Sequence, residues 1–306
     1  MIKKLLRKHY VRYIKKGKWE YKDTSFGKLV CHDAGIECLA SGFVFTEGPV
    51  WFADHGCLLF SDIPASKIYR YIPGLGISVF RNPSGKSNGL TRDRDGMLLA
   101  CEHQNRRVSR THYNGKVEDI VSLFAHKKLN SPNDIVVKKD GAIYFTDPPY
   151  GIEDKEQEQE KQGVYRISPD GKEIKMVAED FDRPNGLAFS PDESKLYVDD
   201  SSRKHIRVFS VDSDGCLKDG KLFIDMNIPD RGNPDGMKVD TQGNLYCTGP
   251  GGIWVMTPEA KLLGRILTHE QPANCAWGDA DYCSLYITAR TALYRIRVNI
   301  PGLPVV

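Results

Sequence analysis

The stretch Asn130–Gly151 has the sequence NSPNDIVVKKDGAIYFTDPPYG. It predicts a β-hairpin, because two apolar runs, 135–137 and 142–146, flank the turn residues Lys139-Asp140-Gly141. The polar pair Asn133-Asp134 stands where the first strand begins. Such a pair either serves its own backbone in a turn or faces a ligand.

Five other segments repeat this hairpin pattern, at 46–62, 87–103, 183–200, 233–249 and 272–289. The polar residues that open the six hairpins lie 39 to 52 residues apart and are Glu47, Asn88, Asn133, Asn185, Asp235 and Asn274. A third strand follows each hairpin, such as KIYRYI at 67–72. Repeats of this kind are typical of propeller blades, since one blade cannot bury both its faces alone. The sequence therefore predicts an all-β, six-bladed β-propeller, closed by an outer strand from IECLASGFVF (36–45) beside the last blade.

The first strand of every propeller blade lines the central channel, so the six polar residues should meet at its axis. Carboxylates crowded there are unfavourable unless a cation or hydrogen bonds compensate them. The oxygen donors favour a hard cation of the calcium type, Ca²⁺, with Mn²⁺, Mg²⁺ and Zn²⁺ as alternatives. The competing interpretation is that each Asn is an ordinary turn former, but this does not explain Glu47 in Thr-Glu-Gly. We therefore expect a metal site in the channel.

A second set of polar residues ends the second strands: Asp62, Glu102, His103, Asp147, Asp199, Asp200, Thr248 and Thr288. Such residues either face a substrate or cap their own hairpins, and we expect His103 and Asp199 to face the substrate. The sequence GKSNG at 85–89 matches G-x-S-x-G, but a strand and turn follow it where a nucleophile elbow needs a helix. The run EDKEQEQEKQ at 153–162 is expected to be a solvated loop.

The net charge of +3 comes from the amino-terminal end, because residues 1–22 hold nine Lys and Arg against one Glu. We divide the chain into a basic extension, 1–30, and a single propeller domain, 31–306. The extension is expected to be solvated or to form a short amphipathic helix rather than to bind nucleic acid or a membrane. It has no apolar run as long as a signal peptide or membrane span, and the eight cysteines form no C-x-x-C pair. These features predict a cytoplasmic protein with reduced thiols.

Motifs in the hairpins resemble the gluconolactonase branch of the senescence-marker/gluconolactonase/regucalcin-like family, among them TEGPVWF (46–52), NSPND (130–134), RPNGLAF (183–189) and NPDGMKVD (233–240). The resemblance covers roughly residues 36–298. It implies a propeller whose channel holds one divalent cation, usually calcium, and which hydrolyses sugar lactones. It also implies metal ligands and a general base, namely Glu47, Asn133, Asn185 and Asp235 as ligands and Asp235 as the base. Ser131 stands where some members carry an Arg two residues before the channel Asn.

The resulting hypothesis is metal-assisted opening of a small lactone by water, with Asp235 as catalytic base. Asp134 and His103 are expected to position substrate hydroxyls or to move a proton, and Asn88, Asp199 and Asn274 are further candidates for substrate binding. Paraoxonases and diisopropylfluorophosphatase are similar propellers, so ester or organophosphate hydrolysis is a neighbouring activity. An alternative from another class is a non-catalytic ligand-binding propeller with structural calcium. The substrate and the oligomeric state stay open.

Overall fold

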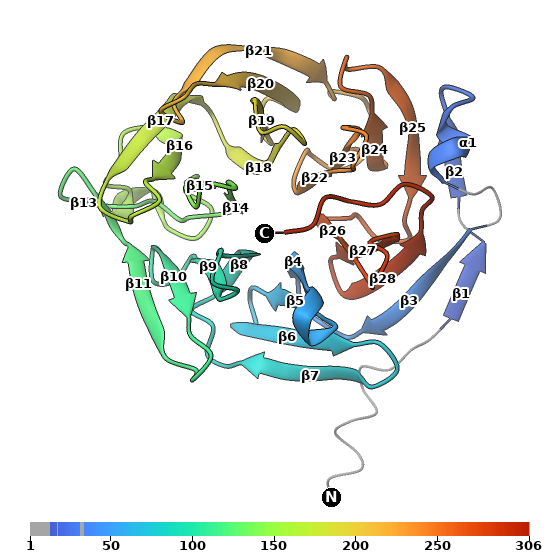
Figure 1. Cartoon of the computed structure of the whole chain (residues 1–306), viewed down its shortest axis with the longest axis horizontal. Coiled ribbons are helices and arrows are strands. Elements are labelled where there is room, and N and C mark those ends of the chain that lie inside the picture. The colour runs from blue at the N-terminus through green and yellow to red at the C-terminus, as the bar shows by residue number, and fades with distance from the viewer. Residues whose placement is uncertain (1–12, 17, 31–33, 306) are drawn as a thin grey trace, which may run out of the picture.

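The structure is a computed structural model that describes residues 13–16, 18–30 and 34–305. Six antiparallel sheets surround a central axis (Figure 1). Helical elements in the described residues are short, and comprise α1 (Phe26–Leu29) and the 3-10 turns η3 (Ala53–His55) and η4 (Asp154–Glu156). The predicted all-β, six-bladed fold is confirmed.

The first three blades are each built from four consecutive strands. Blade 1 contains β4 (Thr46–Phe52), β5 (Cys57–Asp62), β6 (Lys67–Ile72) and β7 (Gly76–Arg81). Blade 2 contains β8 (Ser87–Arg92), β9 (Leu98–Glu102), β10 (Arg107–Thr111) and β11 (Val117–Val121). Blade 3 contains β14 (Ile135–Val137), β15 (Ile143–Thr146), β16 (Gln162–Ile167) and β17 (Ile174–Phe181). A small ribbon joins blades 2 and 3, formed by β12 (Leu123–Phe124) and β13 (Lys127–Lys128).

The last three blades follow the same plan, and two of them gain strands from the amino-terminal part of the chain. Blade 4 contains β18 (Pro184–Phe189), β19 (Lys195–Asp200), β20 (His205–Val211) and β21 (Leu217–Asp225). Blade 5 contains β22 (Met237–Val239), β23 (Leu245–Gly249), β24 (Gly252–Met256), β25 (Leu262–Leu267) and β2 (Lys18–Tyr21). Blade 6 contains β26 (Asn274–Gly278), β27 (Ser284–Ala289), β28 (Ala292–Arg297), β3 (Gly35–Ser41) and β1 (Tyr13–Lys16).

The ring is closed in blade 6, where β3 pairs antiparallel with β28. This is the outer strand that the sequence predicts from 36–45, and it joins the two ends of the propeller by backbone hydrogen bonds. Side chains reinforce the closure, since the rings of Trp51 in blade 1 and Tyr286 in blade 6 stack with centroids 5.6 Å apart. Closure of this kind places the edges of the inner strands inside the ring, where the neighbouring blades protect them.

Burial falls from the axis to the rim of each blade. In blade 1, every residue of β4 and β5 is buried, whereas three residues of the outer strand β7 are exposed. Inner strands have neighbouring blades on both faces, so they are continuous apolar runs rather than alternating ones. This is why the hairpins stand out in the sequence and the fourth strands do not.

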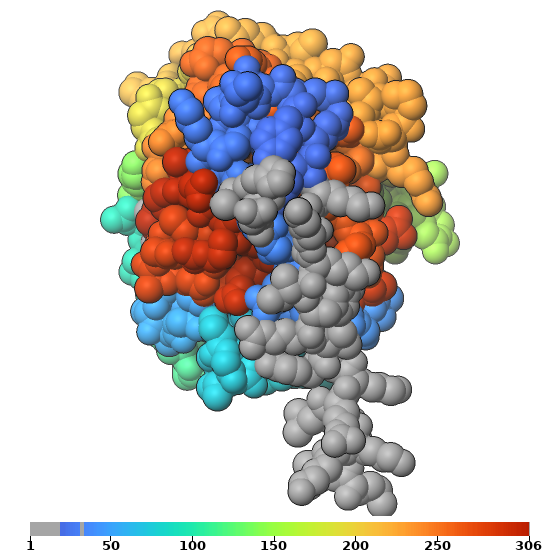
Figure 2. All heavy atoms as spheres, turned by 90° about the vertical axis from the view of Figure 1, so that its right-hand side faces the viewer, coloured from blue at the N-terminus to red at the C-terminus, as the bar shows by residue number. Residues whose placement is uncertain are grey.

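Residues 1–12 of the basic stretch 1–22 lie outside the described residues, and its described part forms two strands rather than the solvated segment or short helix that we expected from its charge. β1 pairs with β3 and β2 pairs with β25, so both add an outer strand to a blade. In Figure 2 the blue segment that contains β2 and α1 lies against blades 5 and 6. An ion pair between Glu20 and Arg265 accompanies the β2 pairing. Exposed outer strands have unpaired backbone groups, and this unused hydrogen-bonding capacity explains why a Lys-rich segment adopts a strand there.

The acidic segment 153–162 is held against the β12–β13 ribbon. The Nε2 of Gln159 donates to the backbone carbonyls of Phe124, Lys127 and Lys128 over 3.0 to 3.2 Å, and Gln159 is buried. A glutamate of the segment, Glu158, accepts the backbone N–H of Lys128 at 2.8 Å. Most of the segment is exposed, as expected for a solvated loop, and Gln159 and Glu158 anchor it to the ribbon.

Five of the cysteines in the described residues are buried: Cys38, Cys57, Cys101, Cys247 and Cys275. None of the helices in the described ranges is long and apolar enough to cross a membrane.

Candidate functional site

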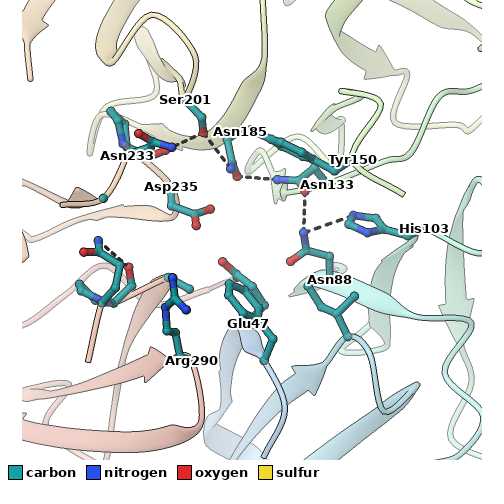
Figure 3. Close-up of a pocket in the computed structure, with 17 residues that line it drawn as sticks. Glu47, Asn88, His103, Asn133, Tyr150, Asn185, Ser201, Asn233, Asp235 and Arg290 are labelled. Carbon is teal, nitrogen blue, oxygen red and sulfur yellow. Dashed lines mark hydrogen bonds between the residues drawn. The ribbon is translucent and has the colours of Figure 1, made fainter. Parts of the chain in front are cut away.

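The first strands of the six blades begin at one end of the channel, around a cavity of about 340 Å³ (Figure 3). Five of the six predicted axial residues line this cavity, and a residue just after β9 joins them; the set is Glu47, Asn88, Asn133, Asn185 and Asp235, with His103. A second cavity, of about 320 Å³, lies toward the other end of the first strands and is bounded by the carboxyl-terminal residues 303–305. The polar residues gather at the first cavity only, because they occupy the starts of the strands.

A glycine follows four of the axial residues, at Gly48, Gly89, Gly186 and Gly236. Neighbouring blades meet backbone to backbone at these points: the N–H of Gly89 donates to the carbonyl of Asn133 at 2.8 Å, and a Cβ on Gly89 would lie 2.5 Å from that oxygen. Among the four, only Gly48 has a positive φ, of +54°. The glycines therefore serve the close approach of blades at the axis rather than tight turns.

The amide side chains form a hydrogen-bonded row along the cavity wall. The Nδ2 of Asn88 donates to Oδ1 of Asn133 at 2.5 Å, and Nδ2 of Asn133 donates to Oδ1 of Asn185. The row continues from Asn185 Nδ2 to the hydroxyl of Ser201 at 3.1 Å. Each nitrogen points along the row, so the oxygens of Asn133 and Asn185 each retain a second lone pair for a ligand.

The carboxyl groups of Glu47 and Asp235 point toward one another across the cavity (Figure 3). Burial raises the pKa of both groups, and each is raised further by neighbouring carboxylates, Asp134 beside Glu47 and Glu47 beside Asp235. The donors that contact Glu47, the N–H of Gly48 and the Nδ2 of Asn274, both reach Oε2. The two carboxyls are thus a crowded pair of like charges that the surrounding donors compensate only in part.

This donor set fits a hard divalent cation. Two facing carboxylates and two amide oxygens supply oxygen ligands of the kind that calcium takes in proteins, and a cation between them would remove the repulsion that raises their pKa values. No group of three or more His, Cys, Asp or Glu side chains within the described ranges forms a metal cluster. The set implied by the family resemblance, Glu47, Asn133, Asn185 and Asp235, contains only two such residues, so this absence does not exclude it.

His103 lies at the edge of the amide row, with Nε2 3.3 Å from Nδ2 of Asn88. Burial lowers the pKa of His103 to about 4. The imidazole is therefore neutral near pH 7 and can accept or donate one hydrogen bond at the cavity wall.

Three of the predicted site residues lie behind the cavity wall and do not line it: Asp134, Asp199 and Asn274. Asp134 occupies the position that is glycine in four other blades, and its Oδ1 accepts its neighbour's N–H, from Ile135, at 2.9 Å. Asn274 links the two acidic groups by donating to Glu47 at 3.0 Å and to Asp134 at 3.4 Å. The Nζ of Lys238 lies 3.4 Å from Oδ1 of Asn274 and places a positive charge below the site.

Asp199 is fully buried beneath the first strands of blades 4 and 5. Burial raises the pKa of Asp199 well above its ordinary value, with Asp235 as the next cause. Its Oδ1 has no hydrogen-bond partner among the described residues. Its raised pKa favours the protonated form, and the carboxyl supports the wall from behind.

The acidic ends of the second strands serve the backbone. Asp62, Asp147 and Asp200 each accept two N–H groups from the segment that leads into the first strand of the same blade. Burial raises the pKa of Asp147 to about 7, although its two amide donors favour the charged form. Glu102 instead accepts from Arg107, Ser109 and Asn105. The capping interpretation therefore describes the three aspartates, whereas Glu102 is held by side chains.

Other cavity residues were missed in the sequence, among them Tyr150, Ser201, Asn233, Gln271 and Arg290. They lie on the connections that follow the second strands or precede the first ones, or between β27 and β28. Those connections differ in length from blade to blade, so no repeat position marks them. Their place in the cavity depends on the closed ring.

Fold and site together define a class: a six-bladed propeller with an oxygen-lined acidic cavity on its axis. Residues 45–291 match the SMP-30/Gluconolactonase/LRE-like region. The chain therefore belongs to the SMP-30/gluconolactonase/LRE-like family, as the sequence motifs predict.

Individual relatives agree with this assignment. The chain is 36% identical over 296 residues to a gluconolactonase of Zymomonas mobilis, covering 87% of this chain and 82% of the relative. It is 28% identical over 273 residues to regucalcin of Xenopus laevis, covering 83% and 86% of the two chains. A solved gluconolactonase structure from Xanthomonas campestris superposes with a TM-score of 0.85 at 32% identity, covering 95% of this chain and 97% of that one.

Proposed function

We propose that this protein is a gluconolactonase-like lactone hydrolase whose activity requires a divalent cation held by Glu47, Asn133, Asn185 and Asp235. Lactone hydrolysis is supported by the relationship to the Zymomonas gluconolactonase, which extends over most of both chains. The observation that carries the cation requirement is the facing pair of carboxyls, whose mutual repulsion a cation would relieve.

The donor types favour Ca²⁺, because all four ligands are oxygen and two are neutral amides. Mn²⁺, Mg²⁺ and Zn²⁺ are the alternatives. When bound, such a cation would polarise the lactone carbonyl and stabilise the negative charge that develops on its oxygen.

Asp235 is the proposed base that takes a proton from the attacking water. It is less buried than Glu47, and it faces the cavity from the opposite wall. Burial, the largest cause, raises the pKa of Asp235 and so favours its acceptance of a proton. The carboxylate has two oxygens, so one can contact the cation while the other contacts the water.

Asn88 and His103 are proposed to contact the substrate directly, because both line the cavity. The neutral imidazole of His103 can exchange hydrogen bonds with a substrate hydroxyl without carrying charge. Asp134, Asp199 and Asn274 lie behind the wall, so we assign them the support of Glu47 and Asp235 rather than contact with the substrate. The predicted location in the cytoplasm stays a prediction.

The test measures cation content and lactone opening on the same samples. Purified wild type and Glu47→Gln are analysed for bound metal, and acid release from a panel of lactones is followed by pH-stat, with spontaneous opening subtracted. Wild type should bind one cation, turn over sugar lactones and lose activity in chelator. Glu47→Gln should lose both cation and activity, while the exposed Glu259→Gln keeps both.

Two outcomes would contradict the proposal in different ways. Wild type that retains its cation yet opens no lactone, ester or organophosphate would be a ligand-binding propeller with a structural cation. Full activity after complete removal of metal would show that the carboxylates act without a cation.

A further inference from the structure

Tyr150 enters the cavity from a connection that has no equivalent in the other blades. It lies between β15, which ends at Thr146, and β16, which begins at Gln162. Its side chain lines the cavity opposite Glu47, next to the amide row (Figure 3).

Two contacts fix the position of this tyrosine. The hydroxyl of Ser131 accepts the N–H of Gly151 at 3.0 Å, which fastens the chain directly after Tyr150. The fit is close, because a Cβ on Gly151 would lie 2.6 Å from Cβ of His103. On the side of blade 4, the guanidinium of Arg183 lies 5.3 Å from the centre of the Tyr150 ring, within cation–π range.

The hydroxyl of Tyr150 keeps acceptor capacity for a substrate hydroxyl. The neighbouring hydroxyl of Ser201 donates its only proton to the carbonyl of Pro234 at 2.6 Å and accepts from Asn185. Tyr150 hydrogen-bonds Ser201, and burial raises the pKa of Tyr150 to about 12. Because the Ser201 proton is already donated to Pro234, the neutral phenol donates to Ser201 and keeps lone pairs that can accept a hydrogen bond from a substrate hydroxyl.

We propose that Tyr150 is a substrate-positioning residue that hydrogen-bonds a hydroxyl of a polyhydroxylated lactone, and that Ser131 holds it in place through Gly151. This inference rests on the proposed lactone hydrolysis and adds a residue that selects hydroxylated lactones. A site built to bond a substrate hydroxyl discriminates against an analogue that lacks it, because its own polar group is then left unpaired. The enzyme should accordingly prefer sugar lactones to unsubstituted cyclic esters.

The experiment compares two lactones with the same ring size, glucono-1,5-lactone and δ-valerolactone, which lacks all hydroxyls. The variant is Tyr150→Phe, which removes only the hydroxyl. We expect kcat/KM for the sugar lactone to fall about tenfold, the usual effect of one neutral hydrogen bond, while kcat/KM for δ-valerolactone changes less than about twofold. Tyr113→Phe is the matched control, because Tyr113 is exposed and lies outside the cavity.

Ser131→Ala tests the anchoring contact. Like Tyr150→Phe, it should lower the ratio of kcat/KM for the sugar lactone to kcat/KM for δ-valerolactone. The change should come mainly from a higher KM for the sugar lactone, because the loop that carries Tyr150 is loosened. Inhibition by gluconate should weaken in both variants, which gives a readout that does not depend on turnover. Thermal melting of each variant confirms that the propeller is intact.

The outcomes separate this inference from the proposed function. Equal losses on both lactones, or no loss on either, would overturn the role of Tyr150 while lactone hydrolysis stands. A wild type that prefers δ-valerolactone would overturn the assigned substrate class. Wild type that opens neither lactone with its cation bound removes the proposed function, and this inference with it.

Discussion

The carboxylates at the axis and those at the ends of the second strands come from the same six repeats, yet the structure uses them differently. Asp62 receives a backbone N–H on each of its two oxygens, both at 3.1 Å. Glu47 faces another carboxyl, and its pKa is raised by burial and by a neighbouring charge. Residue type and burial are alike in the two places. A carboxylate whose oxygens are filled by backbone donors holds the fold, whereas one that faces like charge is available for a cation.

The largest expected effect separates the two axial carboxylates from each other. Asp235→Asn and Glu47→Gln should each reduce lactone hydrolysis about 100-fold or more at limiting cation, since even an outer-shell partner of a metal site is worth about 10 to 100-fold in affinity. Excess calcium should restore Glu47→Gln in large part, because that variant lacks only a ligand. It should not restore Asp235→Asn, which also lacks the proposed base.

Initial rates at several calcium concentrations, together with bound calcium by equilibrium dialysis, give the comparison. Full activity of Asp235→Asn with calcium bound would show that Asp235 is not the base. Replacing a carboxylate at a second-strand end should change neither the rate nor the bound calcium, and Asp62→Asn is the variant that tests this.

The next effect concerns the glycines beside the axial residues. Gly48 and Gly56 have nearly the same φ, +54° and +56°, but a Cβ on Gly48 would overlap the backbone of Asn88, whereas one on Gly56 would meet nothing within 4 Å. Gly56→Ala should cost about 1 kcal/mol of unfolding free energy through its backbone conformation alone. Gly48→Ala should cost about 3 kcal/mol, because it also forces blades 1 and 2 apart.

Urea unfolding of both variants in chelator measures the difference without any contribution from a bound cation. Equal destabilisation would mean that blades do not approach closely at the axis. In that case the Glu-Gly and Asn-Gly pairs would again be explained by turns.

A smaller loss of stability is expected at the second-strand end of blade 1. Asp62→Ala leaves the N–H groups of Val44 and Phe45 without acceptors and should lower the unfolding free energy by about 2 kcal/mol. Asp62→Asn retains one acceptor oxygen and should lose about half as much. Both should bind calcium with unchanged stoichiometry. Loss of calcium in either variant would place Asp62 with the axial residues instead.

The repeats made the axial residues predictable, since first strands share one position relative to the axis in every blade. Glu47, Asn133, Asn185 and Asp235 lie together for this reason. The same logic fails for Asp134 and Asn274, because the repeat position does not say which side chain turns toward the cavity and which supports it from behind. That choice depends on the neighbouring blade. Gly89 of blade 2 has no side chain, and Asp134 of blade 3 occupies the space beside it.

Tyr150 and the strands β1 and β2 were beyond prediction for a different physical reason. Tyr150 reaches the cavity because Ser131 and Arg183, far from it along the chain in opposite directions, hold its loop. The strands β1 and β2 form because blades 5 and 6 present free edges, not because their own sequence alternates. Such features follow from tertiary contacts that only the closed ring supplies.

The smallest predicted effect is the dependence of stability on pH. It tests whether the axial carboxylates, unlike Asp62, lack sufficient compensation from the protein itself. The folded-state pKa values of Glu47 and Asp235 lie above their ordinary values of 4.5 and 3.8. Above those values the cation-free folded protein binds more protons than the unfolded chain, so the contribution of this pair to stability falls as pH rises. Glu47→Gln removes one carboxyl and relieves the other.

In chelator, the unfolding free energy of Glu47→Gln should therefore rise relative to that of wild type by about 1 to 2 kcal/mol between about pH 5 and about pH 8. Added calcium should reverse the order, because it binds more tightly to the protein that retains both carboxylates and therefore stabilises that protein more. Asp62→Asn should show neither the gain nor the reversal, since its carboxylate is compensated by backbone donors. A Glu47→Gln protein less stable than wild type at every pH in chelator would mean that the protein itself compensates Glu47. The axial pair would then be structural like Asp62, and the physical reason to place a cation there would disappear.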